Sequence, residues 1–297
     1  TDLEAWSRLT GHGIVAVASG RDVSRWVIRR GPAFLAAEEA RPIGTRLWLY
    51  TNFDCNLRCD YCCVRSSPTA PRRQLGLERV RRIVGEAGPL GVRQFFITGG
   101  EPFLLPDIGD IVTACAEAAP TIVLTNGMLF TGRRSAVLES LPRGPVTFQI
   151  SLDSATPELH DRHRGPGTWR RAVDGIELAR AAGFRVRLAA TVGTDEEEAK
   201  FRAFLDARHV PVEDRVVRRI ALRGFATMGV AVGREDLVPE LTITADGVYW
   251  HPVGADDDDL LVSRDIFPLA AALEQARQAL AAARAHGGRL ARLFYCA

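Results

Sequence analysis

The chain has 297 residues and a formal net charge of +2, with 46% hydrophobic and 25% charged residues. This is the composition of an average globular protein, and no apolar run reaches the roughly 18–20 residues of a membrane span. Basic residues form no stripe, which argues against a nucleic-acid partner. The first residues lack the basic-then-apolar pattern of a signal peptide. We therefore expect a cytoplasmic protein that binds neither membrane nor nucleic acid.

Strand-like and helix-like runs alternate along most of the chain. The strand-like runs are short, rich in branched and aromatic residues, and bounded by Gly, Asp or Asn. They cover residues 47–50, 94–98, 121–125, 147–152, 186–192 and 215–222. The helix-like runs cover residues 78–90, 107–119, 132–141, 167–182 and 195–208, and Thr194 with Glu197 predicts a capping box for the last. This order indicates a parallel sheet with right-handed crossovers, either open and doubly wound or curved into a partial barrel.

The two ends of the chain follow different patterns. Residues 1–45 are expected to form a small helical or mixed lead-in. Residues 240–253 are typical of a hairpin that turns at Asp246-Gly247, and residues 269–280 repeat apolar side chains at helical spacing. The acidic run 256–259 is interpreted as a solvated loop. The sequence thus predicts three regions, a lead-in at 1–45, an α/β core at 46–225 and a cap of hairpin plus helix at 226–297.

Four of the six cysteines lie between positions 55 and 63. Cys55, Cys59 and Cys62 form a C-x3-C-x2-C pattern directly after the first expected strand. Cubane iron–sulfur clusters are normally held by four thiolates, so three on one loop leave one iron open to another ligand. The alternatives are a structural zinc, which usually shows a second C-x2-C pair, and a ferredoxin-type cluster, for which adjacent Cys63 is a poor fourth ligand. We favour an iron–sulfur site.

The cysteine loop resembles the signature of the radical S-adenosylmethionine (SAM) superfamily, including the aromatic Tyr61 before the third cysteine. Further motifs of that family follow in order at the ends of expected strands or before a helix, namely Thr98-Gly99-Gly100-Glu101-Pro102, Thr125-Asn126-Gly127, Ser151-Leu152-Asp153 and the stretch His160–Gly165. The match covers roughly residues 45–225. Within the family, the sequence resembles the branch of SPASM/twitch-type and MoaA-like enzymes. This resemblance implies an α/β fold, a (β/α)6 partial TIM barrel.

The resemblance also implies the cofactors and their ligands. One [4Fe–4S] cluster is expected on Cys55, Cys59 and Cys62, with SAM on the open iron. The resemblance assigns the SAM ammonium to Gly99, Gly100 and Glu101, its carboxylate to Arg164 and Ser151, its ribose to Asn126 and Asp153, and its adenine to Tyr61. All these motifs fall at carboxyl ends of strands, where α/β folds bind ligands. Turn chemistry is the alternative for Ser151, Asn126 and Asp153.

The C-terminal region departs from the family pattern. Many relatives of this branch carry a cysteine-rich extension with auxiliary clusters, but only Cys63, Cys115 and Cys296 lie outside the triplet here. We therefore predict no auxiliary cluster and a degenerate cap that covers the barrel mouth. Cys115 is interpreted as a core thiol. His251 is interpreted as a structural histidine, with a contact to substrate or a role as a lone fourth metal ligand as the alternatives. Cys296 is a hypothetical hydrogen donor to a substrate radical, with an incidental tail thiol as the alternative.

The activity that the resemblance implies is reductive cleavage of SAM to a 5′-deoxyadenosyl radical, which takes a hydrogen atom from a substrate. The electron is expected from flavodoxin or ferredoxin. We expect a small metabolite as substrate, such as a sugar or nucleoside of a natural-product pathway, because the short lead-in shows no clear leader-peptide domain. A ribosomal peptide is the alternative substrate. A non-catalytic iron–sulfur electron-transfer or sensor protein is the competing class, and the motifs at Gly99–Glu101 and Arg164 oppose it.

Overall fold

The computed structural model describes residues 13–19, 24–29 and 42–285. The chain divides into two compact units, Thr1–Pro42 and Ile43–Ala297. The described part of the first unit is an antiparallel pair of strands, β1 (Gly13–Ser19) and β2 (Ser24–Arg29). The lead-in, expected to be helical or mixed, therefore contains a two-stranded sheet.

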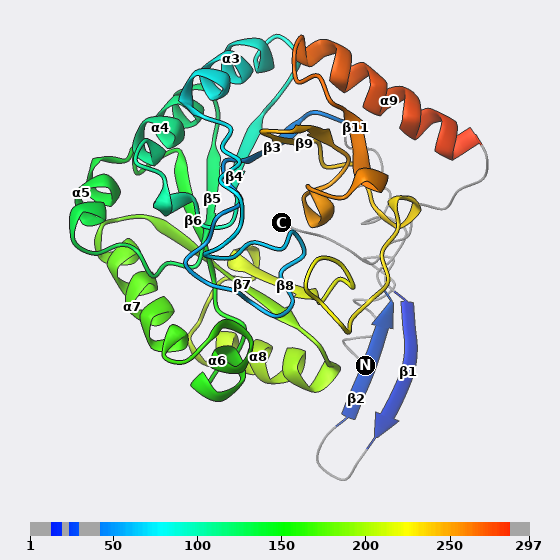
Figure 1. Cartoon of the computed structure of the whole chain (residues 1–297). Helices are drawn as coiled ribbons and strands as arrows, with labels where there is room; N and C mark the ends of the chain where they lie inside the picture. The colour runs from blue at the N-terminus through cyan, green and yellow to red at the C-terminus, as the bar shows by residue number, and fades with distance from the viewer. Residues whose placement is uncertain (1–12, 20–23, 30–41, 286–297) are drawn as a thin grey trace. The chain divides into compact units, whose positions relative to one another are not determined.

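The second unit is built on a nine-stranded sheet. Six consecutive parallel strands form its main part, β3 (Arg46–Tyr50), β4 (Gln94–Thr98), β5 (Thr121–Thr125), β6 (Val146–Ser151), β7 (Arg185–Val192) and β8 (Arg215–Arg219). They curve around a central space, and helices cover the outer side of the sheet (Figure 1). The expected (β/α)6 partial TIM barrel is confirmed.

The outer helices follow the strands in the expected order. They are α3 (Leu77–Ala87), α4 (Ile108–Ala118), α5 (Arg133–Ser140), α6 (Pro157–Arg164), α7 (Thr168–Ala181) and α8 (Asp195–Ala207). Thr194 and Glu197 form the predicted capping box at the start of α8. Cys115 of α4 is fully buried, as predicted for a core thiol. No helix among the described residues is long and apolar enough to cross a membrane.

One helix was not expected from the sequence. Residues 160–165 were predicted to precede a helix, but most of them lie within α6 itself. Gly165 ends this helix, with a positive φ of 110°, and its N–H donates to the carbonyl of Asp161. The stretch therefore presents its side chains from a helical turn rather than from a loop.

The C-terminal part extends the same sheet. β9 (Thr242–Thr244) and β10 (Gly247–Tyr249) form the predicted hairpin, and β11 (Leu261–Ser263) and α9 (Leu269–Ala285) follow it. The turn of the hairpin is Ala245-Asp246 rather than the expected Asp246-Gly247, because Gly247 already pairs with Thr244 as the first residue of β10. β9 pairs in parallel with β3, so the hairpin continues the barrel sheet beyond its first strand. The division into a core ending at 225 and a cap starting at 226 stays a prediction.

The acidic run 256–259 is not simply a solvated loop. Both Asp257 and Asp259 form ion pairs with the guanidinium of Arg223, at 2.7 and 2.6 Å. Asp257 also pairs with Arg65, which follows the cysteine triplet, at 3.3 Å. The run therefore connects the C-terminal part to the cysteine loop and to the segment after β8.

Alternation along the strands separates an outer core from an inner wall. Val146, Phe148 and Ile150 of β6 pack into the core beneath the helices, so the residues between them face the barrel interior. On the side of β3–β5 the inner wall carries an apolar cluster of Trp48, Phe96, Ile122 and Leu124. On the side of β6–β8 it carries the polar residues Gln149, Arg187, Thr191 and Arg218. The interior is therefore apolar on one side and polar on the other.

Candidate functional site

A cavity that opens to solvent lies where the parallel strands end. All three cysteines of the triplet line it. The predicted SAM-binding residues that also line it are Tyr61, Gly99, Gly100, Asn126, Ser151 and Arg164. Glu101 and Asp153 do not belong to its lining. The motifs recognised in the sequence thus converge on one space.

The cysteine loop holds its thiols among backbone donors. The N–H of Leu57 donates to Sγ of Cys55 at 3.4 Å, and the N–H of Ser66 donates to Sγ of Cys62 at 3.3 Å. Such hydrogen bonds are typical around the sulfurs of iron–sulfur clusters. The hydroxyl of Ser66 is buried in the cavity lining and has no partner within the described chain.

Burial controls the protonation of these thiols. It raises the pKa of Cys59 to about 11 and that of Cys55 above its usual value, although Arg164 opposes the shift at Cys59. Both thiols therefore stay protonated at neutral pH unless a bound cation stabilises the thiolate, as cluster iron does. No three His, Cys, Asp or Glu side chains converge on a single metal ion in the part of the chain that the structure describes. A cluster fits the loop because each thiolate binds a different iron.

The glycine pair at the end of β4 lies directly against the start of the cysteine loop. The N–H of Gly100 donates to the carbonyl of Asn52 at 2.9 Å. A Cβ at Gly100 would overlap the carbonyl oxygen of Asp54. Only glycine permits this approach, which leaves the backbone of residues 99 and 100 open to the cavity.

Glu101 is fully buried and bonded to the end of the neighbouring strand. Its carboxylate accepts hydrogen bonds from Thr125 Oγ1 at 2.8 Å, from the N–H of Asn126 at 2.8 Å and from the N–H of Phe103 at 3.0 Å. Burial raises the pKa of Glu101, although these donors oppose the shift. The side chain therefore fastens the ends of β4 and β5 to each other, and its predicted contact with SAM stays a prediction.

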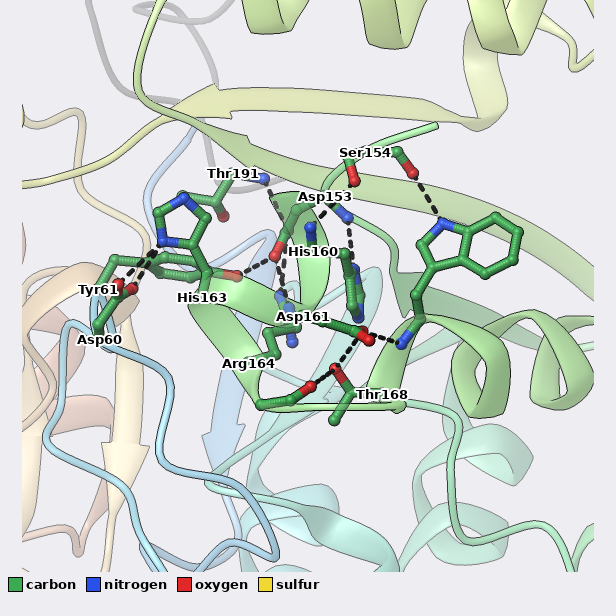
Figure 2. A network of polar contacts seen from close by, with 12 residues as sticks. Asp60, Tyr61, Asp153, Ser154, His160, Asp161, His163, Arg164, Thr168 and Thr191 are labelled. Atoms are coloured by element: carbon green, nitrogen blue, oxygen red, sulfur yellow. Dashed lines mark hydrogen bonds and ion pairs between the residues drawn. The ribbon is translucent and has the colours of Figure 1, made fainter. Parts of the chain in front are cut away.

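Asp153 lies at the centre of a buried network (Figure 2). Nε of Arg164 donates to its carboxylate at 2.6 Å and the N–H of Thr191 donates at 3.1 Å. The hydroxyl of Tyr61 donates to the same carboxylate. Burial alone would raise the pKa of Asp153, but the charge and hydrogen bonds of Arg164 outweigh it and hold the pKa below its usual value. The carboxylate is thus ionised and already occupied by protein donors.

This network joins α6 to the cysteine loop. Tyr61 and Asp60 stand between the second and third cysteines, and Nδ1 of His163 lies 2.9 Å from the carboxylate of Asp60. The N–H of Asp60 also donates to the carbonyl of His163 at 3.2 Å. Elsewhere on the helix, Nδ1 of His160 accepts from the N–H of Asp153 at 3.1 Å. The loop that carries the cysteines is therefore fixed to α6 through both Asp60 and Tyr61.

Sequence reasoning missed several residues of the site. Asn56 accepts a hydrogen bond from Nδ2 of Asn126 at 2.8 Å, so the predicted ribose ligand already contacts the cysteine loop. Asn52 donates to the carbonyl of Glu101 at 3.1 Å. Arg218 and Arg219, at the end of β8, line the cavity. The available signal was the position of Asn52, Arg218 and Arg219 near strand ends and of Asn56 within the cysteine loop.

The C-terminal part closes one side of the cavity. Pro252 and Val253 belong to its lining, and the buried ring of His251 accepts from the N–H of Val253 at 3.2 Å. Burial, together with the charges of Arg223 and Arg218, lowers the pKa of His251 to about 3. His251 therefore acts as a neutral cap of the segment that follows it. Cys296 lies outside the described residues.

Comparison with known proteins gives the family. A model of the radical SAM superfamily matches residues 49–207, more than half of the chain. An AdoMet-dependent heme synthase of Methanosarcina barkeri is 32% identical over 153 residues, 50% of this chain and 43% of that protein. A GTP 3′,8-cyclase of Microcystis aeruginosa is 33% identical over 164 residues, 51% of this chain and 49% of that protein. The chain thus spans about half the length of these curated relatives.

Solved structures share the fold at lower identity. Streptococcus suis SuiB bound to S-adenosylmethionine aligns with a TM-score of 0.53 and 21% identity, covering 69% of this chain and 47% of that chain. Native anSMEcpe with bound AdoMet aligns with a TM-score of 0.57 and 14% identity, covering 78% of this chain and 82% of that chain. The chain therefore belongs to the radical SAM superfamily, a family of enzymes that use a [4Fe–4S] cluster and S-adenosylmethionine.

Proposed function

We propose that this chain binds one [4Fe–4S] cluster through Cys55, Cys59 and Cys62 and uses SAM to remove a hydrogen atom from a small organic metabolite. The convergence of the three thiols with Gly99, Gly100 and Arg164 on one cavity carries the proposal. When bound, the reduced cluster supplies the electron that cleaves SAM to methionine and a 5′-deoxyadenosyl radical. A low-potential protein such as flavodoxin or ferredoxin is the proposed electron donor.

The residues of the chain would orient SAM around the cysteine loop. Backbone carbonyls of Gly99 and Gly100 are the proposed partners of its ammonium, because no side chain covers them. The guanidinium of Arg164 is the proposed partner of its carboxylate, with Ser151 as a second donor. Asp153 acts through Arg164 and Tyr61, which it holds in place, and Glu101 acts by fastening the strand ends.

The substrate class rests on the relatives and on the cavity. The names of the two curated relatives above describe a heme synthase and a GTP cyclase, and neither name refers to a peptide. In this chain the lining beyond the SAM residues combines the apolar Trp48 and Leu124 with the cationic Arg218 and Arg219. Such a surface suits a small amphipathic molecule with polar or anionic groups. Epimerisation, dehydrogenation and rearrangement all fit this proposal.

A peptide substrate is the second candidate. The observation in its favour is the strand pair β1 and β2 in the lead-in, because extended peptides bind to sheet edges by adding a strand. SuiB, one of the fold neighbours, has also been solved bound to its precursor peptide SuiA, although at 18% identity it supports only the fold. Loss of peptide binding after deletion of residues 1–42 would favour this candidate, whereas unchanged binding would argue against it.

The test of the proposed function is anaerobic reconstitution followed by incubation with SAM and dithionite. We expect about four irons per chain and formation of 5′-deoxyadenosine in the wild type. Replacing the three cysteines by Ala should abolish both, whereas Cys115→Ala, in the core of α4, should retain the cluster. Retention of full cluster iron in the triple variant would refute the assignment. A bound cluster without 5′-deoxyadenosine, also with candidate substrates present, would favour a non-catalytic iron–sulfur protein.

A further inference from the structure

A second cavity lies at the opposite end of the barrel. It opens to solvent and is lined by residues at the amino-terminal ends of the parallel strands. Arg46 of β3, Gln94 of β4, Thr147 of β6 and both Arg185 and Arg187 of β7 belong to its lining. None of the three cluster cysteines lines it. The cavity is therefore separate from the site of the radical chemistry.

The lining is rich in guanidinium groups, and two of them have counter-charges. Nη1 of Arg46 lies 3.3 Å from the carboxylate of Glu240, and Nε of Arg185 lies 2.7 Å from that of Asp214. Arg187 differs, because no carboxylate among the described residues lies within ion-pair distance of it. Among the described residues, Glu213 is the one acidic residue in the lining. Arg187 thus brings a positive charge into the cavity without a direct partner.

Buried hydrogen-bonding groups without partners lie beside this charge. Nε of Arg187 is buried and makes no hydrogen bond within the described chain. Gln149 does not belong to the cavity lining, but it stands directly opposite Arg187 in the register of β6 and β7, one step deeper in the barrel than Thr147. It is 1% exposed and leaves both polar atoms of its amide unpartnered. A buried donor or acceptor that stays unsatisfied destabilises the folded protein. Three unsatisfied atoms on adjacent strands of one wall therefore indicate a missing partner.

The chemistry of these groups defines that partner. A water molecule would satisfy the amide of Gln149 but would leave the charge of Arg187 unbalanced. Burial and the neighbouring charges of Arg46, Arg185 and Arg218 lower the pKa of Arg187, although Asp214 opposes the shift. A hydrogen phosphate ion satisfies all three atoms, because its oxygens accept from Nε of Arg187 and Nε2 of Gln149 while its O–H donates to Oε1 of Gln149.

We propose that the amino-terminal end of the barrel binds an oxyanion of the phosphate class, held by Arg187 and Gln149 with Arg46 and Arg185 at its rim. The donors offered are a planar guanidinium fork and an amide NH2, which match phosphate oxygens. The site lies on the wall opposite the apolar cluster of Trp48 and Phe96, so apolar side chains exclude water from one side of it. This proposal is independent of SAM cleavage.

Binding of inorganic phosphate to the reconstituted full-length protein tests the site. Isothermal titration at constant ionic strength should show one phosphate per chain, bound more tightly than chloride. Arg187→Gln should weaken binding about ten- to a hundredfold, the usual effect of losing a charge-assisted hydrogen bond. Arg170→Gln, on an exposed helix surface, should leave phosphate binding unchanged. Equal affinity for phosphate and chloride, or equal affinity in wild type and Arg187→Gln, would overturn the proposal.

A second variant covers the case in which Arg187→Gln does not fold. Gln149→Leu keeps the volume and removes the unpartnered amide, so it should fold and bind phosphate more weakly; unchanged binding would contradict the site. Glycerol 3-phosphate distinguishes a free phosphate ion from an organic phosphate, since tighter binding than inorganic phosphate indicates the latter. Formation of 5′-deoxyadenosine is measured in the same preparations, so that failure of the radical chemistry and absence of phosphate binding are separate results.

Discussion

Replacing Asp153 by Asn keeps the shape of the side chain and removes the charge that faces Arg164. The side chain of Asp153 is 1% exposed and that of Arg164 is 9% exposed, so the variant leaves a buried guanidinium without a counter-charge. Removing one partner of a buried ion pair costs about 3–5 kcal/mol. That is a large part of the roughly 5–15 kcal/mol by which a native protein is stable. We expect a value near the upper end, because Tyr61 and Thr191 donate to the same carboxylate.

Urea unfolding followed by circular dichroism measures this cost. Asp174→Asn is the matched control, because Asp174 pairs with Arg170 on the surface of α7 with side chains 50% and 76% exposed. An exposed pair of this kind contributes about 0.3–0.5 kcal/mol. Equal losses of unfolding free energy in the two variants would refute the view that Asp153 anchors the network. Asp153→Asn should also weaken SAM binding, since Arg164 lines the cavity.

Two further predictions follow from the geometry. Gly100→Ala should abolish cluster retention or SAM binding, because its Cβ would overlap the backbone of Asp54. Gly85→Ala is the control. Gly85 lies in open space on α3, so this variant should raise the free energy of unfolding by about 0.5–1 kcal/mol. Full SAM binding in Gly100→Ala would contradict the close approach of these backbones. The pKa of His251 is about 3 in the folded state and 6.5 when unperturbed, so the unfolded state takes up the proton first as the pH falls. The free energy of unfolding should therefore decrease below about pH 6.5 by about 1.4 kcal/mol per pH unit. His251→Gln should reduce this dependence of the unfolding free energy on pH, whereas His209→Asn, on an exposed turn, should not. Equal slopes in wild type and His251→Gln would show that the folded state does not keep His251 neutral.

The sequence predicted the parallel strands well, because every second residue of each strand is apolar. These residues need a layer of helices to cover them. It missed α6 because that helix buries a single residue, His160, and so lacks an apolar stripe. Its start signal was present in Thr156 and in Pro157, which occupies the first helical position. A helix with such weak local signals forms only when tertiary contacts stabilise it. For α6 these contacts are its hydrogen bonds to the cysteine loop.

The sequence predicted which residues lie in the site, but not which groups each of them hydrogen-bonds to. Strand-end motifs placed Asp153 and Glu101 near SAM, since carboxyl ends of parallel strands meet at one edge. The choice between a ligand and a protein donor depends on side-chain geometry that spacing does not encode. In the structure both carboxylates are saturated by protein hydrogen bonds, Glu101 from β5 and Asp153 from α6 and β7. The pairing of Gln149 with Arg187 likewise needed the register of two strands.

The division of the barrel interior has a consequence for molecular recognition. A flat molecule that enters the cavity of the cysteine triplet between Trp48 and Leu124 on one side and Thr191 and Arg218 on the other meets two chemically different walls. Turning it over would place its hydrogen-bonding edge on indole and aliphatic carbons and its hydrocarbon edge on Thr191 and Arg218. The orientation of the molecule is thus selected by the cost of removing water from its polar edge and from the polar wall. One face of the molecule is always presented to the same strands, and the stereochemistry of a reaction in this barrel inherits that choice.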